Sequence, residues 1–361
     1  MGKAMDFSKI DKNFLINKKV DTETVVFRSC TDESFSLFGV FHDGEGLCRM
    51  PKEAASAVSP SILTMFRQPA GGRLRFKTNS PYIALMVKTP GISKYSNIAL
   101  SMSCGFDIYV GGRFDKNLTP DPKDEKDFLA VRDYGGFWEK DVTVYLPLFN
   151  DVTELYVGLH KDATVSPGAG YSGTELPVVF YGSSITHGAC ASRPSMAYEA
   201  LLSKMLDIDF VNLGFAGSAK GEEKMAEYIS GLDMSVFVYD YDHNAPNAEH
   251  LRKTHKRFFD IVRAKNPDLP IIMITRPSLR TDEGIISHQK EILNTYNQAL
   301  EDGDRNVYYI DGQRLFDGYC TDDCLVDGTH PGDLGFMCMA RSIAPVLEKV
   351  ISDLKERGKN E

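Results

Sequence analysis

The second half of the sequence alternates short apolar segments with helical patterns, and this alternation constrains the fold more than any other feature. The apolar segments lie at residues 178–181, 210–213, 236–239, 271–275 and 307–310. Helical patterns separate and follow them, at about 196–205, 221–229, 248–264, 286–301 and 334–354. Strands that alternate with helices in this way form a parallel sheet covered on both faces. The sequence therefore predicts an α/β domain over residues 171–361.

The first half has a different texture, in which short apolar or alternating runs are separated by Gly, Pro, Asp and Asn. Such runs lie at 24–28, 37–42, 73–77, 83–88, 106–110, 142–146 and 154–159. Many short strands with regular turn signals are typical of a β-sandwich or jelly roll. Residues 161–175 are rich in Gly, Ser, Thr and Pro and are the best linker candidate. We therefore expect an all-β, jelly-roll-like domain over residues 1–170.

Composition excludes several classes of function. The formal net charge of −9 argues against a nucleic-acid partner, which requires a basic face. No apolar run approaches the roughly 20 residues that span a bilayer, so we expect no membrane partner. The 7 scattered cysteines and the absence of an apolar leader favour a reducing compartment and hence the cytoplasm. The sequence leaves open whether residues 1–4 are native and whether the chain forms a homo-oligomer.

Ser184 lies in the segment VVFYGSSITHG, which begins at Val178. The apolar, β-branched start of this segment breaks into small residues, as a buried strand does when it ends in a tight turn. A serine at such a turn lies above the carboxyl ends of the strands, where open α/β sheets bind their ligands. Ser184 is therefore a candidate nucleophile, although a serine at such a position, taken alone, is more often only a small turn residue.

Asp327 stands three residues before His330, and Gly328 between them permits a sharp bend. In that arrangement an aspartate can hold Nδ1 of the imidazole and leave Nε2 free to take a proton from a serine hydroxyl. Asp327, His330 and Ser184 together predict a serine hydrolase.

Acyl transfer by a serine also needs hydrogen-bond donors for the oxyanion that develops. The segment GFAGS follows the predicted strand at 210–213, and glycine lets a backbone N–H approach a ligand closely. The segment DYDHNAP follows the strand at 236–239 and contains Asn244, whose side-chain amide is a second candidate donor. Because parallel strands end at one rim of the sheet, we expect both segments beside Ser184.

The ordered set of Ser, Gly, Asn and Asp-x-x-His resembles the SGNH/GDSL hydrolase superfamily over roughly residues 176–355. The resemblance implies an SGNH-type three-layer sandwich with a parallel sheet. It also implies that Ser184 is the nucleophile, His330 the general base and Asp327 its orienting partner. The oxyanion hole would be formed by the backbone N–H groups of Ser184 and Gly217 and by the Asn244 amide.

Two motif positions depart from that superfamily. Ser183 replaces the Asp of Gly-Asp-Ser, and the segment DHNA at 242–245 replaces Gly-x-Asn-Asp. Neither changed position is a catalytic group in the superfamily, so the resemblance still implies the same chemistry.

The first half strengthens the resemblance, because residues 105–109 read Gly-Phe-Asp-Ile-Tyr. This run is similar to the Gly-x-Asp-Leu-Tyr signature of a β-domain that precedes one SGNH subgroup. Enzymes of that subgroup include bacterial carbohydrate esterases that remove O-acetyl groups from plant polysaccharides. We expect Asp107 and Tyr109 themselves to serve the β-domain.

Three further residues are candidates for substrate contacts. His187 and His243 are near the site in sequence and are rival bases, but neither has a carboxylate at a spacing that favours Nδ1 orientation. We therefore expect both to line the substrate site. Trp138 is a candidate for stacking on a sugar, with packing in the β-domain as the alternative. Cys320 and Cys324 form a single C-x₃-C pair, which is too few ligands for zinc, so we expect no metal.

The sequence thus predicts a carboxylic ester hydrolase without a cofactor that removes O-acetyl groups from acetylated xylo- or manno-oligosaccharides. The loops near the site offer small or polar side chains, such as Ser192, Arg193, Ser218 and Lys220, which suit a hydroxyl-rich substrate and a short acyl group. One alternative is a short-chain esterase or thioesterase that acts on a non-carbohydrate substrate. The other is a carbohydrate-binding protein with an inactive hydrolase half, against which the intact motifs argue.

Overall fold

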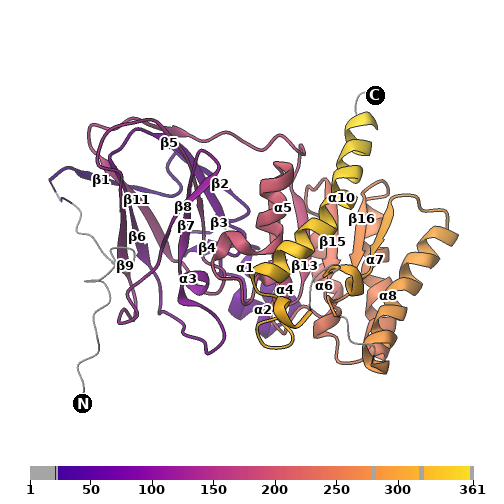
Figure 1. The fold of residues 1–361 in the computed structure, drawn as a ribbon. Helices are drawn as coiled ribbons and strands as arrows, with labels where there is room; N and C mark the ends of the chain where they lie inside the picture. The colour runs from indigo at the N-terminus through magenta and orange to yellow at the C-terminus, as the bar shows by residue number, and fades with distance from the viewer. Residues whose placement is uncertain (1–20, 22, 279–281, 317–320, 358–361) are drawn as a thin grey trace, which may run out of the picture.

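The computed structural model describes residues 21, 23–278, 282–316 and 321–357 and shows a β-domain beside an α/β domain (Figure 1). The antiparallel strands, coloured indigo to magenta, form one side of the molecule. The parallel sheet and its helices, ending in yellow, form the other side. No helix in the described ranges is both long and apolar enough to cross a bilayer.

The β-domain consists of antiparallel sheets around one apolar core. One sheet has the order β1 (Val25–Ser29), β11 (Glu154–His160), β6 (Tyr82–Lys88) and β9 (Phe128–Asp133). The other has the order β12 (Val165–Pro167), β5 (Arg73–Thr78), β10 (Lys140–Tyr145), β7 (Phe106–Val110) and β8 (Arg113–Leu118), and β2 (Ser36–Phe38) also pairs with β5. Alternate residues such as Leu74 and Phe76 enter the core. A short pair, β3 (Phe41–His42) and β4 (Leu47–Cys48), stands apart.

The α/β domain is built on a parallel sheet of 5 strands. Their order is β14 (Phe210–Gly214), β13 (Val178–Gly182), β15 (Val236–Asp240), β16 (Ile271–Ile274) and β17 (Val307–Ile310). Successive residues enter opposite cores, so that Phe180 and Val238 pack on one face of the sheet and Tyr181 and Tyr239 on the other. The predicted parallel sheet covered on both faces is confirmed.

Helices cover the two faces unequally. Helices α5 (Tyr198–Leu206) and α10 (Asp333–Arg357) pack together on one face, and α6 (Glu223–Ser230), α7 (Ala248–Lys265) and α8 (Glu283–Glu301) cover the other. A short helix, α9 (Thr321–Cys324), precedes α10. Helix α8 begins before the predicted residue 286 because the Asp282 side chain accepts the N–H of Ile285 at 3.0 Å and caps the helix.

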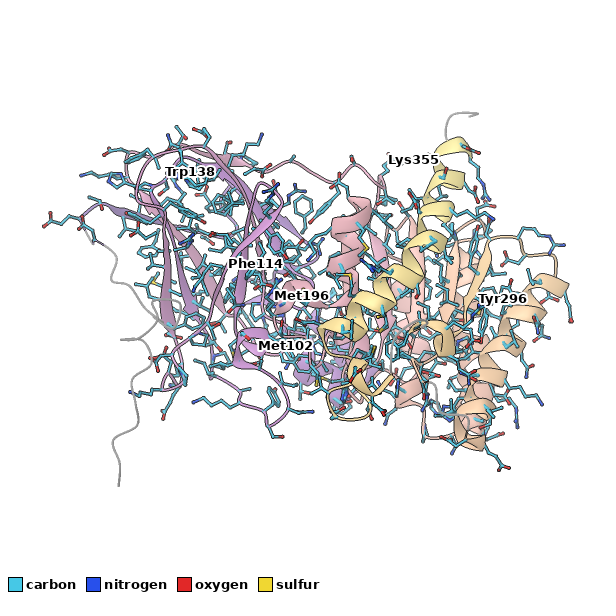
Figure 2. The ribbon with its side chains drawn as sticks, in the orientation of Figure 1. Met102, Phe114, Trp138, Met196, Tyr296 and Lys355 are labelled. Atoms are coloured by element: carbon cyan, nitrogen blue, oxygen red, sulfur yellow. The ribbon has the colours of Figure 1, made fainter. Side chains whose placement is uncertain are left out.

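Residues of the first half complete both cores of the α/β domain. Helices α1 (Lys52–Val58) and α2 (Pro60–Met65) bury Ala55 and Ile62 in the core that α6 and α7 line. Helix α3 (Leu100–Ser103) buries Met102 in the other core, and Figure 2 places Met102 and Met196 where the two domains meet. The sequence analysis did not predict these helices, because elements this short are stabilised by tertiary packing rather than by their own pattern.

Since the domains share apolar cores, we expect the chain to unfold in one cooperative transition. The fluorescence of Trp138, the only tryptophan in the sequence, reports on the β-domain. Far-UV circular dichroism reports mainly on the helices of the α/β domain. In a urea titration both signals should change at the same midpoint and with the same m value. Clearly separated midpoints would contradict the shared core.

Candidate active site

Ser184 is presented by a tight connection between β13 and the short helix α4 (Ser184–His187). The Oγ of Ser183 accepts the N–H of Ile185 at 3.2 Å and caps this helix. Only glycine fits at position 182, because a Cβ there would lie 2.4 Å from the backbone carbonyl oxygen of Asp240. The strand therefore ends abruptly and leaves Ser184 half-buried at the carboxyl edge of the sheet.

Ser184, His330 and Asp327 form a hydrogen-bonded chain. The Oγ of Ser184 lies 2.8 Å from Nε2 of His330, and Nδ1 of His330 lies 2.8 Å from Oδ2 of Asp327. The other carboxylate oxygen accepts the N–H of Thr329 at 3.1 Å and that of His330 at 2.9 Å. Gly328 makes this turn possible with a φ of 78°. Because the carboxylate accepts the Nδ1 proton, Nε2 is left to accept the proton of the serine hydroxyl.

The carboxylate of Asp327 is held in its charged form. Partial burial raises the pKa of Asp327, but hydrogen bonds from the backbone and ring of His330 and from the Asn97 amide outweigh burial and lower the pKa well below its ordinary value. A carboxylate that stays charged can stabilise the imidazolium that forms when His330 takes a proton.

The loops after β14 and β15 begin level with Ser184. Gly182 at the end of β13 is paired with Gly214 in β14 and with Asp240 in β15. The N–H of Phe215 donates to the carbonyl of Gly182 at 2.9 Å, which keeps the first of these loops against the nucleophile turn. The structure thus brings together the three segments that the sequence analysis placed on one rim.

Gly217 and Asn244 lie on these two loops. Gly217 has a φ of 66°, a left-handed conformation that favours glycine, and a Cβ at this position would meet open space. Asn244 ends a 3₁₀ turn (Asp242–Asn244), and its Nδ2 donates to the carbonyl of Phe215 at 3.2 Å. The contact ties the two loops together. A side-chain amide carries a second N–H donor, so the contact is compatible with a role of Asn244 in an oxyanion hole.

His187 does not line a substrate site, and the prediction that it does is wrong. The ring is fully buried, its Nε2 lies 2.8 Å from the carbonyl oxygen of Leu148, and its Nδ1 accepts the N–H of Ala216 at 3.4 Å. It stacks on Phe149 with ring centroids 4.0 Å apart. Burial lowers the pKa of His187 well below its ordinary value, so the ring is neutral. His187 therefore joins the β-domain to the loop after β14.

His243 directly precedes Asn244, and its role as a substrate contact remains a prediction. Burial lowers the pKa of His243 to about 4, and the Arg276 cation adds to this effect while Asp242 opposes it. A histidine with such a pKa is a weak base near neutral pH. Because Ser184 pairs with His330, the geometry favours His330 as the base.

Trp138 lies at the outer end of the β-domain, far from the helix that carries Ser184 (Figure 2). Its ring packs edge-to-face on Tyr134 with centroids 5.6 Å apart, and Nζ of Lys140 lies 4.0 Å from its centroid. The prediction that Trp138 lines the substrate site is therefore wrong. Trp138 lies between β9 and β10, and only the folded chain shows at which end of the sheet that connection lies.

Asp107 and Tyr109 make contacts within the β-domain, as expected, since Oδ1 of Asp107 accepts a hydrogen bond from Nδ2 of Asn117 at 2.8 Å. They also reach across to the α/β domain, which the sequence analysis did not predict. Oδ2 of Asp107 accepts three hydrogen bonds from the α/β domain. The donors are the N–H of Ser195 at 2.9 Å, the hydroxyl of Ser195 at 2.6 Å and Nη1 of Arg193 at 3.1 Å. The hydroxyl of Tyr109 accepts a hydrogen bond from Nζ of Lys204 at 3.0 Å. This interdomain network holds the segment after α4 against β7.

The sequence analysis missed Arg49 and Asn97. Arg49 is buried and donates to the carbonyls of Gly214 at 2.6 Å and Asn212 at 3.2 Å, at the start of the loop that carries Gly217. Burial lowers the pKa of Arg49 to about 9. Asn97 donates to Asp327 at 2.9 Å. No local pattern marks either residue, because both contacts join positions that are far apart in the sequence.

One group of potential metal ligands lies in the described part of the chain, at Cys190, Asp327 and His330, whose ligand atoms are within 4.8 Å of one another. Two of these residues already bond to each other through Nδ1 and Oδ2, so a metal at this position would disrupt the chain that includes Ser184. Cys324 is buried, and Cys320, the other cysteine of the C-x₃-C spacing, lies outside the described residues.

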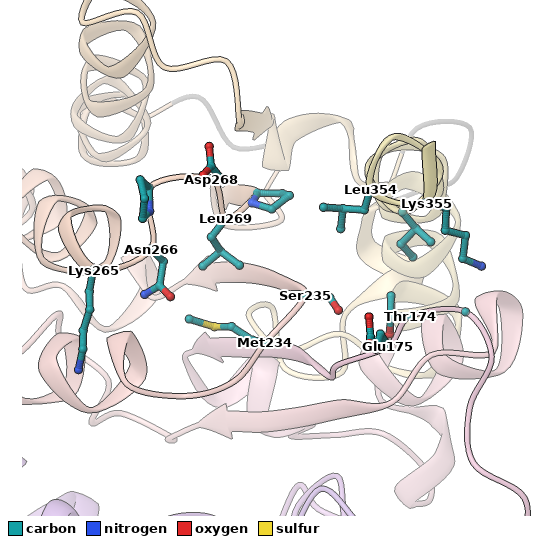
Figure 3. A pocket seen from close by; sticks show the side chains of 14 residues that line it. Thr174, Glu175, Met234, Ser235, Lys265, Asn266, Asp268, Leu269, Leu354 and Lys355 are labelled. Atoms are coloured by element: carbon teal, nitrogen blue, oxygen red, sulfur yellow. The ribbon is translucent and has the colours of Figure 1, made fainter. Parts of the chain in front are cut away.

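A cavity of about 540 Å³ lies at the opposite, amino-terminal edge of the sheet (Figure 3). Its walls include Met234 and Leu269, which precede β15 and β16, and Leu354 and Lys355 near the end of α10. The cavity is therefore remote from Ser184, which lies at the carboxyl edge.

Two family models match the chain in succession. Residues 175–348 match the GDSL-like lipase/acylhydrolase family. Residues 26–165 match the N-terminal domain of SGNH-hydrolase-type esterases, which carries the name of the Gly-x-Asp-Leu-Tyr motif. No curated protein matches the sequence.

Solved structures share the whole two-domain arrangement. A protein from Bacteroides ovatus, provisionally named a GDSL-like lipase, is 28% identical with a TM-score of 0.82, over 91% of this chain and 98% of that chain. A family two carbohydrate esterase from Clostridium thermocellum, in complex with cellohexaose, is 13% identical with a TM-score of 0.61, over 91% and 99%. An acetyl xylan esterase from the rumen bacterium Butyrivibrio proteoclasticus has the same identity, TM-score and coverage. At 13% identity these likenesses establish the fold alone.

The interdomain network predicts the effect of removing Asp107. Asp107→Ala should lower the free energy of unfolding by about 3–5 kcal/mol, because it leaves the Arg193 cation and the buried Ser195 N–H without their acceptor. Asp141→Ala, an exposed position on β10, should change it by less than about 0.5 kcal/mol. Urea denaturation of both variants checks this, and equal stabilities would contradict the role assigned to Asp107.

Proposed function

The chain belongs to the GDSL-like lipase/acylhydrolase family, and we propose that it is a serine esterase that removes O-acetyl groups from acetylated xylo- or manno-oligosaccharides. Family membership by itself supports an ester hydrolase. One observation carries the catalytic part of the proposal: Ser184 Oγ lies 2.8 Å from His330 Nε2, and the opposite ring nitrogen is bonded to Asp327.

The reaction follows from the properties of these groups. Ser184 attacks the acyl carbonyl carbon while His330 accepts the hydroxyl proton, and Asp327 stabilises the resulting imidazolium. The backbone N–H groups of Ser184 and Gly217 and the amide of Asn244 stabilise the oxyanion. His330 then gives its proton to the leaving alkoxide. Water repeats the cycle on the acyl-enzyme, which releases acetate and restores the serine.

The choice of substrate rests on the polarity of the surroundings and on relatives of the same fold. The exposed segment 93–97 of the β-domain approaches Asp327 and is polar, with two serines, a lysine, a tyrosine and an asparagine. A wall of this kind suits a hydroxyl-rich leaving group. Two relatives of this fold are an acetyl xylan esterase and a carbohydrate esterase in complex with cellohexaose. The polar residues proposed from the sequence contribute less, because Arg193 is engaged in the interdomain network.

Removal of the nucleophile should abolish turnover. Ser184→Ala and His330→Ala should each lower kcat for acetate release by about 10⁴–10⁶. The first variant lacks the nucleophile that forms the covalent intermediate, and the second lacks the base that accepts the serine proton. Both variants should retain the melting temperature of the wild type within a few degrees. His243→Ala is the matched control for the choice of base. A dead His243→Ala beside an active His330→Ala would contradict the proposed mechanism.

Acyl length and leaving group distinguish the proposed substrate from the alternatives. We expect kcat/KM to fall steeply from acetyl to butyryl aryl esters. We also expect kcat/KM to be higher for acetylated xylo- or manno-oligosaccharides than for aryl acetates. The measurement is acetate release at matched substrate concentrations, with Ser184→Ala as the blank. A preference for octanoyl esters would overturn the carbohydrate assignment, and a preference for thioesters would favour a thioesterase.

A further inference from the structure

The loop between β6 and α3 leaves the β-domain and reaches the carboxylate of Asp327. Nδ2 of Asn97 donates to Oδ2 of Asp327 at 2.9 Å, and this is the same oxygen that lies 2.8 Å from Nδ1 of His330. The remaining described donors to Asp327 are the backbone N–H groups of Thr329 and His330, which belong to the same turn as the carboxylate. Asn97 thus ties the Asp327 carboxylate to the β-domain.

Asn97 stands on a loop that is fastened along its length. The N–H of Thr89 donates to Oδ1 of Asp127 at 2.9 Å, and the N–H of Ser93 donates to Oδ1 of Asn150 at 3.0 Å. Beyond Asn97, the side chain of Ile98 packs against the apolar core that lies under α5 and α10. Because Asn97 is held in place by the β-domain, its hydrogen bond can fix the position of the Asp327 carboxylate relative to that domain.

Asn97 also contacts the segment that follows the nucleophile. The Sγ of Cys190 donates to the carbonyl oxygen of Asn97 at 3.4 Å, and Cys190 follows α4 with a φ of 70°. Through its main chain Asn97 therefore meets the Ser184 side of the site, and through its side chain it meets the Asp327 side. A single residue of the β-domain thus contacts both Asp327 and the segment that follows Ser184.

We propose that Asn97 is a positioning residue of the β-domain that orients Asp327 and, through it, His330 toward Ser184. The proposal rests on the proposed function of this chain as a serine esterase. An amide suits this place because it donates a hydrogen bond without a charge of its own, so it fixes Oδ2 and leaves the carboxylate free to stabilise the imidazolium. A carboxylate at position 97 would instead repel Asp327.

The first test separates catalysis from binding. Asn97→Ala should lower kcat by about 10-fold, the effect of one hydrogen bond to a charged group, and leave KM for an aryl acetate within about twofold. Asn97→Asp should lower kcat further. Asn79→Ala, which removes an asparagine hydrogen bond to Thr164 N–H at the Trp138 end of the β-domain, is the control and should leave kcat unchanged. A wild-type kcat in Asn97→Ala, or a loss confined to KM, overturns the proposal.

The second test asks whether Asn97 acts through Asp327. In the Asp327→Asn background, a further Asn97→Ala change should lower the residual kcat by less than twofold, because the carboxylate that Asn97 orients is absent. A full second loss of about 10-fold would show that Asn97 acts independently of Asp327, and it would overturn the proposal.

A third readout does not depend on the natural substrate. The rate at which a fluorescent fluorophosphonate labels Ser184 reports the activation of the serine. We expect this rate to fall about 10-fold in Asn97→Ala and to be unchanged in Asn79→Ala. If the wild type is labelled but hydrolyses no acetylated oligosaccharide, the substrate assignment fails while the role of Asn97 is still tested. Labelling at the wild-type rate in Asn97→Ala overturns the proposal whatever the substrate.

Discussion

The candidate site depends on one constraint: the parallel strands β13, β14 and β15 all end at the same level of the sheet. Gly182, Gly214 and Asp240 lie side by side in β13, β14 and β15, so the segments that follow them leave the sheet together. Ser184 therefore lies beside the loops that carry Gly217 and Asn244. Parallel strands direct all their carboxyl ends to one edge, and for this reason residues distant in the sequence converge there without a local signal that joins them.

The β-domain is part of the framework of this site. Its Leu148 carbonyl pairs with the buried His187, its Arg49 donates to main-chain carbonyls before the Gly217 loop, and its Asn97 reaches Asp327. These contacts act on the backbone and on the carboxylate of the α/β domain. Because the two domains also share apolar cores, the position of the site depends on both of them.

Several polar residues take part in the protein's internal contacts and not in substrate binding. His187 is enclosed between the two domains, and Arg193 belongs to the interdomain network with Asp107. A polar side chain near a motif in the sequence can either form a buried hydrogen bond or face a ligand. Both outcomes are common, because buried polar groups need hydrogen-bond partners. Position in the sequence cannot distinguish the two outcomes, and this is why the substrate contacts were predicted less well than the Ser184–His330–Asp327 arrangement.

The sequence by itself determined the parallel sheet, the antiparallel β-domain, and the Ser184 turn and Asp327-x-x-His330 pair that the structure brings together. These depend on hydrophobic periodicity, on glycine at tight turns and on short spacings, all of which are local properties. Only the tertiary structure decided that Asp107 joins the domains, that Trp138 lies at the far end, and that Asn97 meets Asp327. Those contacts link residues separated by tens to hundreds of positions, and they are set by how the two domains pack, which no local pattern encodes.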